Sequence, residues 1–176
     1  MTEAWTAPPV ERTEPGLILG ERQALDAWLD FHRDTLVLKC AGLTAGQLKE
    51  RAVPPVPAVP ARPGAAHDRG GALVVPHPRG GHRHGVPVRP GQAGQDFEAL
   101  DDTDATANIE ALKQEIEHAR TAPAGKQLDD VVPSHGHHPE RTRDIRWIYP
   151  HMIEEYARHN GHANLLRERI DGVSGD

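Results

Sequence analysis

The chain has 176 residues, a formal net charge of −6, 17 glycines, 16 prolines, 12 histidines and one cysteine. This length suits a single domain over residues 1–176, and the acidic balance indicates neither a nucleic-acid partner nor binding to an anionic membrane surface. The sequence contains neither a membrane-spanning run nor a signal peptide, and the single Cys40 excludes an internal disulfide and fits a reducing cytoplasm.

The N-terminal part predicts an arm followed by one helix. Residues 1–19 are rich in proline and are expected to form a loose arm, with the apolar run at residues 17–19 lying on the body. Residues 21–42 predict an amphipathic helix, because apolar side chains recur at helical spacing. Its stripe consists of Leu25, Trp28, Leu29, His32, Leu36 and Leu43. We interpret His32 as a core or rim histidine rather than a ligand, since no ionisable partner lies at helical spacing.

A short second helix is predicted to follow the first. Thr44 and Gln47 form a capping-box pattern, in which each side chain bonds the backbone of the other residue. Leu48 is expected to pack back on the body, and the helix should end before Pro54, because the residue before a proline disfavours helical backbone.

Residues 56–95 differ in kind from the rest of the chain. They contain no Lys, Glu, Phe, Tyr or Trp, and Asp68 is their one acid. No helical or strand period is present, which is typical of a basic, disordered linker. A loop of this length is unusual inside a compact domain, and a bundle of the remaining helices lacks a fourth member.

The composition of this segment resembles GC-rich DNA translated in the wrong frame. Codons permitted by residues 56–78, read one base out of register, encode a helical stretch with aromatics, acids and one histidine. That histidine falls almost at the position of His67. We therefore hypothesise two compensating single-base shifts, one near codon 56 and one before Asp96.

Ordinary helical sequence returns after the anomalous segment. Acids and a threonine at residues 101–104 suit the first turn of a helix over residues 104–120. The stripe of this helix consists of Ile109, Leu112, Ile116 and Ala119. The loop at residues 122–141 ends in a histidine-rich tract, Ser134-His135-Gly136-His137-His138. We interpret this tract as exposed histidines rather than as a metal site.

The last helix is predicted over residues 142–169, with Asp171-Gly172 as its stop. Its apolar residues Ile148, Met152 and Leu166 follow steps of four and three. The same steps place ionisable residues on this stripe, namely Glu155, His159 and His162. Pro150 removes one backbone hydrogen bond and is expected to kink the first turns.

Glu155 and His159 form the strongest candidate site. Residues four apart on a helix lie one above the other, roughly 6 Å apart along the axis. A carboxylate and an imidazole that face a core must be paired or must hold a metal, because burying them alone is costly. The spacing leaves both interpretations open: two metal ligands, or a buried pair bonded to a neighbour such as Arg158.

The chain resembles the DinB/YfiT-like superfamily of metal-binding four-helix bundles, and within it the mycothiol-dependent enzymes and the mini-circle proteins. The resemblance covers roughly residues 11–55 and 97–174. It rests on Trp28-Leu29-Asp30-Phe31-His32, on Leu38-Lys39-Cys40, on Arg51-Ala52-Val53-Pro54-Pro55 and above all on residues 151–169. It implies an all-α fold, a four-helix bundle whose second helix is degraded to irregular structure in this chain.

The resemblance also implies a metal site. In this family a histidine of the second helix and a pair four apart on the last helix hold a divalent metal, usually zinc or nickel. Glu155 and His159 match that pair, whereas His67 is only a stand-in for the histidine lost to the suspected frame shift. His162 matches a family position to which we assign no role.

The implied activity is that of a metal-dependent S-transferase or isomerase. Mycothiol would be the thiol cosubstrate and would attack a small-molecule electrophile, so Cys40 is not required. Two alternatives remain open: a non-enzymatic helical bundle that binds a small molecule or a partner chain, and an inactive product of a frame-shifted gene. A homodimer is compatible with either kind of bundle.

Overall fold

The computed structural model describes residues 5–50, 104–133 and 142–174. Its helices are α1 (Glu21–Cys40), α2 (Ala45–Leu48), α4 (Ala105–Thr121) and α5 (Ile145–Asp171), and its strands are β1 (Val131–Pro133) and β2 (Thr142–Asp144). The all-α prediction is therefore confirmed for this part of the chain. His67 and the anomalous segment 56–95, where the degraded second helix was expected, lie outside the described residues. No described helix is both long enough and apolar enough to cross a membrane.

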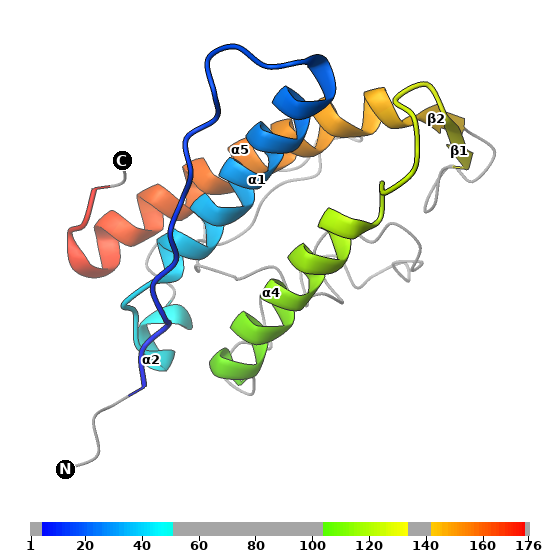
Figure 1. The fold of residues 1–176 in the computed structure, drawn as a ribbon. Helices are drawn as coiled ribbons and strands as arrows, with labels where there is room; N and C mark the ends of the chain where they lie inside the picture. Colours follow the sequence, from blue (N-terminus) through cyan, green and yellow to red (C-terminus); the bar gives the residue numbers. More distant parts are fainter. Residues whose placement is uncertain (1–4, 51–103, 134–141, 175–176) are drawn as a thin grey trace, which may run out of the picture.

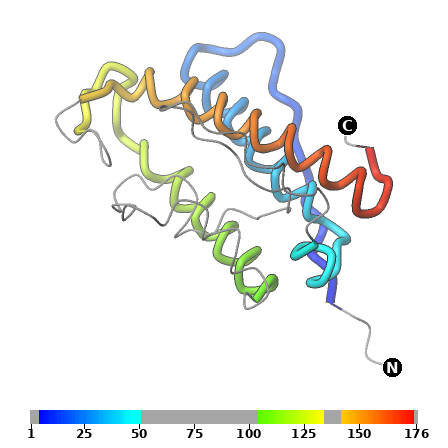
Figure 2. Tube along the Cα trace, turned by 180° about the vertical axis from the view of Figure 1, so that it is seen from behind, coloured from blue at the N-terminus to red at the C-terminus, as the bar shows by residue number. Residues whose placement is uncertain are grey.

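Helices α1 and α5 lie side by side and run in the same direction, as Figures 1 and 2 show from opposite sides. Hydrogen bonds join them at successive levels, with Tyr149 opposite Asp26 and Asn160 opposite His32. Helix α4 runs in the opposite direction, with its first turn near α2 and its last turn near the middle of α1 (Figure 1). Among the described elements, α5 therefore packs mainly against α1.

The stripes predicted for the first long helix and for α4 contribute five of the twelve buried residues of the larger core cluster. Ile109, Leu112 and Ile116 of α4 are all buried, as the spacing predicted. They pack with residues from α1, α2, α5 and the N-terminal segment. The cluster contains Ala7, Leu36, Val37, Cys40, Leu43, Leu48, Ala105, Ala163 and Leu166 besides these three. Trp28 is an exception to the α1 prediction, because it lies at the edge of the stripe and is 46% exposed.

The predicted caps are present. The Thr44 hydroxyl accepts from the backbone N–H of Gln47 at 3.2 Å, and the Gln47 side chain accepts from the backbone N–H of Thr44 at 3.0 Å. Asp104 caps α4 by accepting from the backbone N–H groups of Thr106 and Ala107. These side chains satisfy amide donors that no helical carbonyl can reach, which stabilises each helix start.

The N-terminal arm is not loose in its described part. Ala7 is buried, donates its N–H to the carbonyl of Leu43 and accepts from the N–H of Gly42, both at 2.8 Å. The guanidinium of Arg12 lies 4.5 Å from the centre of the Phe31 ring. The prediction that residues 17–19 lie on the body is also wrong, because Leu17 and Ile18 are fully exposed. Backbone hydrogen bonds, rather than the apolar run, attach this segment.

The start of α5 differs from the prediction as well. Residues 142–144 form an antiparallel ribbon with residues 131–133, and the helix begins only at Ile145. Asp144 caps it, and the first helical N–H groups donate to carbonyls of the preceding loop instead of to helical ones. The helix then continues through Pro150 and ends at Gly172, whose φ of 77° requires a residue without a side chain.

A cluster of charges ties α4 to α1. Arg120 donates to Asp30 at 3.0 Å and to Asp34 at 2.8 Å, and it also pairs with Glu117 on its own helix. The pKa of Arg120 is raised, because these hydrogen bonds outweigh its partial desolvation. Since Asp30 and Asp34 of α1 share its guanidinium, Arg120 holds the C-terminal end of α4 against α1.

Tyr149 anchors the start of α5 to α1 and should make stability depend on alkaline pH. Its hydroxyl donates to Asp26, which also accepts from Arg22 at 3.1 Å. Burial, and then the hydrogen bond to Asp26, raises the pKa of Tyr149 from about 10 to about 12. The folded state therefore retains a proton that the unfolded chain loses first, so this contribution to stability falls as pH rises from about 10 to about 12.

We expect both tyrosines of the native chain to ionise above pH 10 in a titration followed by absorbance at 295 nm, because burial also raises the pKa of Tyr156. The Tyr156→Phe variant isolates the signal of Tyr149. Ionisation of Tyr149 at its ordinary pKa in that variant would contradict the buried hydrogen bond.

Cys40 should be inert in the native protein. Its side chain is buried, its thiol lies 3.5 Å from the carbonyl oxygen of Leu36, and burial raises its pKa to about 12. Since only the thiolate reacts with disulfide reagents, we expect labelling at pH 8 to be roughly 100-fold or more slower than in the unfolded chain. Release of a chromogenic thiol, followed with and without denaturant, measures this ratio. Equal rates would mean that Cys40 is accessible.

Candidate metal centre on helix α5

The middle of α5 carries the predicted pair. One carboxylate oxygen of Glu155 (Oε2) lies 4.0 Å from Nε2 of His159, one helical turn further along. Glu155 is 7% exposed, whereas the His159 side chain is 48% exposed. The structure therefore brings the two residues together, with the carboxylate at the buried side and the imidazole at the rim.

The buried face of α5 overlaps the predicted stripe only in part, at Glu155 and Leu166. Tyr149, Asn160 and Ala163 are buried, whereas His159 and His162 are exposed. The buried residues of α5 are centred roughly 50° around the helix from that stripe, at 100° per residue. A hydropathy pattern gives little weight to tyrosine, asparagine and alanine, so it missed this face.

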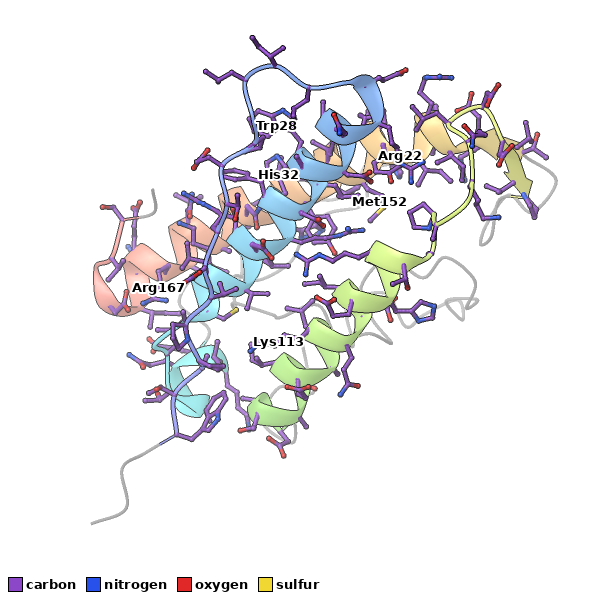
Figure 3. All side chains as sticks on the ribbon, viewed as in Figure 1. Arg22, Trp28, His32, Lys113, Met152 and Arg167 are labelled. Carbon is purple, nitrogen blue, oxygen red and sulfur yellow. The ribbon has the colours of Figure 1, made fainter. Side chains whose placement is uncertain are left out.

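Asn160 and His32 join the two helices beside the candidate centre. The side-chain amide of Asn160 donates to the backbone carbonyl of His32 at 2.9 Å and lies 3.4 Å from Nδ1 of its ring. Burial lowers the pKa of His32, which favours a neutral ring at neutral pH. The interpretation of His32 as a rim histidine is confirmed, and Figure 3 shows its place on α1.

Arg158 is the cation that Glu155 holds in this structure. Its Nη1 lies 3.3 Å from Oε2 of Glu155, and its Nη2 donates to Glu154. These carboxylates raise the pKa of Arg158, first through the hydrogen bond that Arg158 donates to Glu154 and then through the charge of Glu155. The ion pair anticipated from the sequence is therefore present, and it shows that this position attracts positive charge.

A further histidine joins the cluster. Ligand atoms of His151, Glu154 and Glu155 all lie within 4.8 Å of one another, and Nδ1 of His151 is 3.9 Å from Oε2 of Glu154. Sequence reasoning considered residues 155, 159 and 162 and missed His151. The signal was available, because His151 precedes Glu155 by four residues and therefore shares its side of the helix.

The donors present fit a divalent metal ion. Carboxylate oxygen and imidazole nitrogen are the ligands that zinc and nickel take in proteins. Glu155 supplies a buried carboxylate, and histidines lie one turn before it and one turn after it. The stand-in His67 and the histidine-rich tract at residues 135–138 lie outside the described residues. The ring of His162 is 6.3 Å from that of His159, centre to centre.

Comparison with protein families gives a match, which includes the candidate centre. The model of the mycothiol-S-transferase family matches residues 79–172, which include α4, the β-ribbon and all of α5. The match covers more than half of the chain and begins inside the anomalous segment 56–95. Neither a curated protein nor a solved structure gives a match. The chain belongs to the mycothiol-S-transferase family, a DinB/YfiT-like family, as the resemblance of its last helix predicted.

Proposed function

We propose that this protein is a divalent-metal-dependent S-transferase or isomerase that uses mycothiol as its thiol cosubstrate, with Glu155 and His159 as metal ligands. One observation carries the proposal: a buried carboxylate and an imidazole lie 4.0 Å apart inside the segment that the family model matches. Zinc or nickel is the metal expected for this donor set.

The residues around the pair have distinct roles in this proposal. Burial keeps water away from the Glu155 carboxylate, so its charge acts more strongly on a bound cation than an exposed carboxylate would. His159 presents its imidazole from the exposed rim, where a cosubstrate can approach. Arg158 holds the carboxylate in place through Nη1 and must release it when a cation binds.

The chemistry follows from the properties of a thiol. Glu155 and His159 would hold the divalent ion, which would supply thiolate at neutral pH by lowering the pKa of a thiol placed beside it. The sulfur then forms a bond to an electrophilic carbon while the bond to the leaving group breaks, and the thiol proton passes to solvent. With an activated double bond, addition and later loss of the thiol give isomerisation instead. Cys40 takes no part, because it is buried.

The test uses the full chain purified without added metal. Bound zinc and nickel are measured by mass spectrometry, and mycothiol consumption is followed with chlorodinitrobenzene as the electrophile. We expect about one metal ion per chain, and conjugation that a chelator removes and that His159→Asn strongly weakens. A metal-free chain whose melting is unchanged by chelator, with no mycothiol consumed, would instead support the non-enzymatic bundle.

The suspected frame shift requires a separate measurement, because a damaged gene product would also be inactive. DNA sequencing between codons 55 and 96 decides whether residues 56–95 are encoded as printed. If the DNA sequence encodes the helical segment in the shifted frame, the corrected chain should be assayed beside this one. Activity in the corrected chain alone would assign the loss to the missing second-helix histidine rather than to Glu155 and His159.

A further inference from the structure

We propose that α5 carries a second divalent-cation site, formed by His151, Glu154 and Glu155. It shares Glu155 with the centre proposed above, but it needs neither His159 nor any thiol chemistry. Ligand atoms of the three residues already lie within 4.8 Å of one another. Ligands of one tetrahedral zinc ion are about 3.3 Å apart, so small side-chain rotations, chiefly of the exposed Glu154, close the site without moving the helix.

One metal ion cannot use both histidines. His151 and His159 are eight residues apart, which places them about 12 Å apart along the helix axis. Two ligands of one ion are separated by only about 3–4 Å, and two imidazoles cannot span the remaining distance from these positions. The ligands of α5 therefore divide into two sets, one on each side of Glu155, and Glu155 belongs to both.

The site already holds a cation in the form of Arg158. Its guanidinium contacts Glu155 at 3.3 Å and bonds Glu154, so one positive group neutralises both carboxylates. The Arg158 side chain is 52% exposed and can swing into solvent at little cost. A divalent ion brings twice the charge to the same two carboxylates. Arg158 therefore acts as a competitor that lowers the affinity for metal.

Aromatic contacts hold His151 in position. The ring of Trp147 stacks on that of His151, with centres 4.7 Å apart and planes at 28°. The guanidinium of Arg143, from strand β2, lies 4.4 Å from the centre of the Trp147 ring. A ligand whose ring orientation is fixed by neighbours loses less freedom on binding metal, which favours a built site over a chance cluster.

The first experiment measures zinc binding by calorimetry to the full, metal-stripped chain. We expect His159→Asn to retain one Zn²⁺ per chain, and we expect the His151→Asn/His159→Asn double variant to bind it at least about tenfold more weakly. His118→Asn, on the exposed side of α4, is the matched control for weak binding by surface histidines. The His118→Asn/His159→Asn double variant should bind zinc as tightly as His159→Asn alone. Circular dichroism verifies that each variant is folded.

The second experiment tests the competitor. In the His159→Asn background, Arg158→Met should raise the zinc affinity at least about tenfold, because the two carboxylates lose their built-in cation. Arg169→Met removes an exposed arginine from the same helix and should have no such effect. An unchanged affinity on Arg158→Met, or an unchanged affinity on His151→Asn, would overturn the second site.

The outcomes separate this inference from the proposed function. If His159→Asn loses all zinc while the wild-type chain conjugates mycothiol, the second site is wrong and the thiol chemistry stands. If His159→Asn keeps zinc through His151 while no chain consumes mycothiol, the second site stands and the proposed function is wrong.

Discussion

Replacing Glu155 with glutamine is expected to remove the metal at Glu155 and His159 and to lower the rate of mycothiol conjugation by about 100-fold or more. The substitution keeps the shape of the side chain but exchanges a buried carboxylate for a neutral amide, which is a far weaker ligand for zinc or nickel. Metal content by mass spectrometry and conjugation under identical conditions measure both effects.

The neighbouring Glu154 provides the matched control. It lies one position earlier on α5, is exposed, and bonds the same Arg158. Glu154→Gln should therefore keep the Glu155–His159 pair and conjugate mycothiol at a rate within a few-fold of wild type. Equal losses in both variants would indicate that the charge around Arg158 matters rather than a metal ligand, and full activity in Glu155→Gln would remove Glu155 from the centre.

Replacing Arg167 with methionine is expected to lower the free energy of unfolding by about 2 kcal/mol. The Nη1 of Arg167 donates to the carbonyls of Lys39 at 2.9 Å and Ala41 at 2.7 Å, where α1 ends. Its Nε lies 2.8 Å from Asp171, and its side chain is largely buried. The arginine thus places a positive charge at the negative end of α1 and satisfies two carbonyls that no helical N–H reaches. Figure 3 shows Arg167 where α5 passes this end of α1.

Thermal unfolding should show this loss as a fall in Tm of about 4–8 °C, as expected for a domain of this size. Arg167→Lys keeps the charge but offers one ammonium group instead of a planar guanidinium, so its Tm should lie between those of the wild type and Arg167→Met. Arg169→Met, two residues further along α5 and exposed, should leave Tm unchanged. A Tm for Arg167→Met equal to that of Arg169→Met would show that the end of α1 needs no cap from α5.

Local sequence determined much of the helical framework. Ile109, Leu112 and Ile116 recur at the helical period and are all buried in α4. The capping pair Thr44 and Gln47 forms the predicted reciprocal hydrogen bonds. These features depend on residues at most four positions apart, so spacing and side-chain chemistry are sufficient to predict them.

The candidate centre was only partly open to prediction. The four-residue spacing of Glu155 and His159 guaranteed that they share a side of a helix, and the structure brings them to 4.0 Å. The approach of Glu154 to His151 depends on rotamers and on the stack with Trp147. Arg158 was named only as an example of a neighbour, because sequence alone does not decide which of several charges a carboxylate binds.

Only the tertiary structure decided which side of α5 is covered and how the N-terminal segment is attached. Helical spacing places residues on a common stripe but does not say which part of it meets a neighbour, and α5 buries Tyr149, Asn160 and Ala163 while the predicted His159 and His162 stay exposed. Tyr149 and Asn160 can be buried because Asp26 and the backbone of His32 accept their hydrogen bonds. The sequence by itself determined that α5 carries a carboxylate and imidazoles one turn apart. The packing of α1 determined that Glu155 is buried at the edge of that interface while His159 stays at the rim.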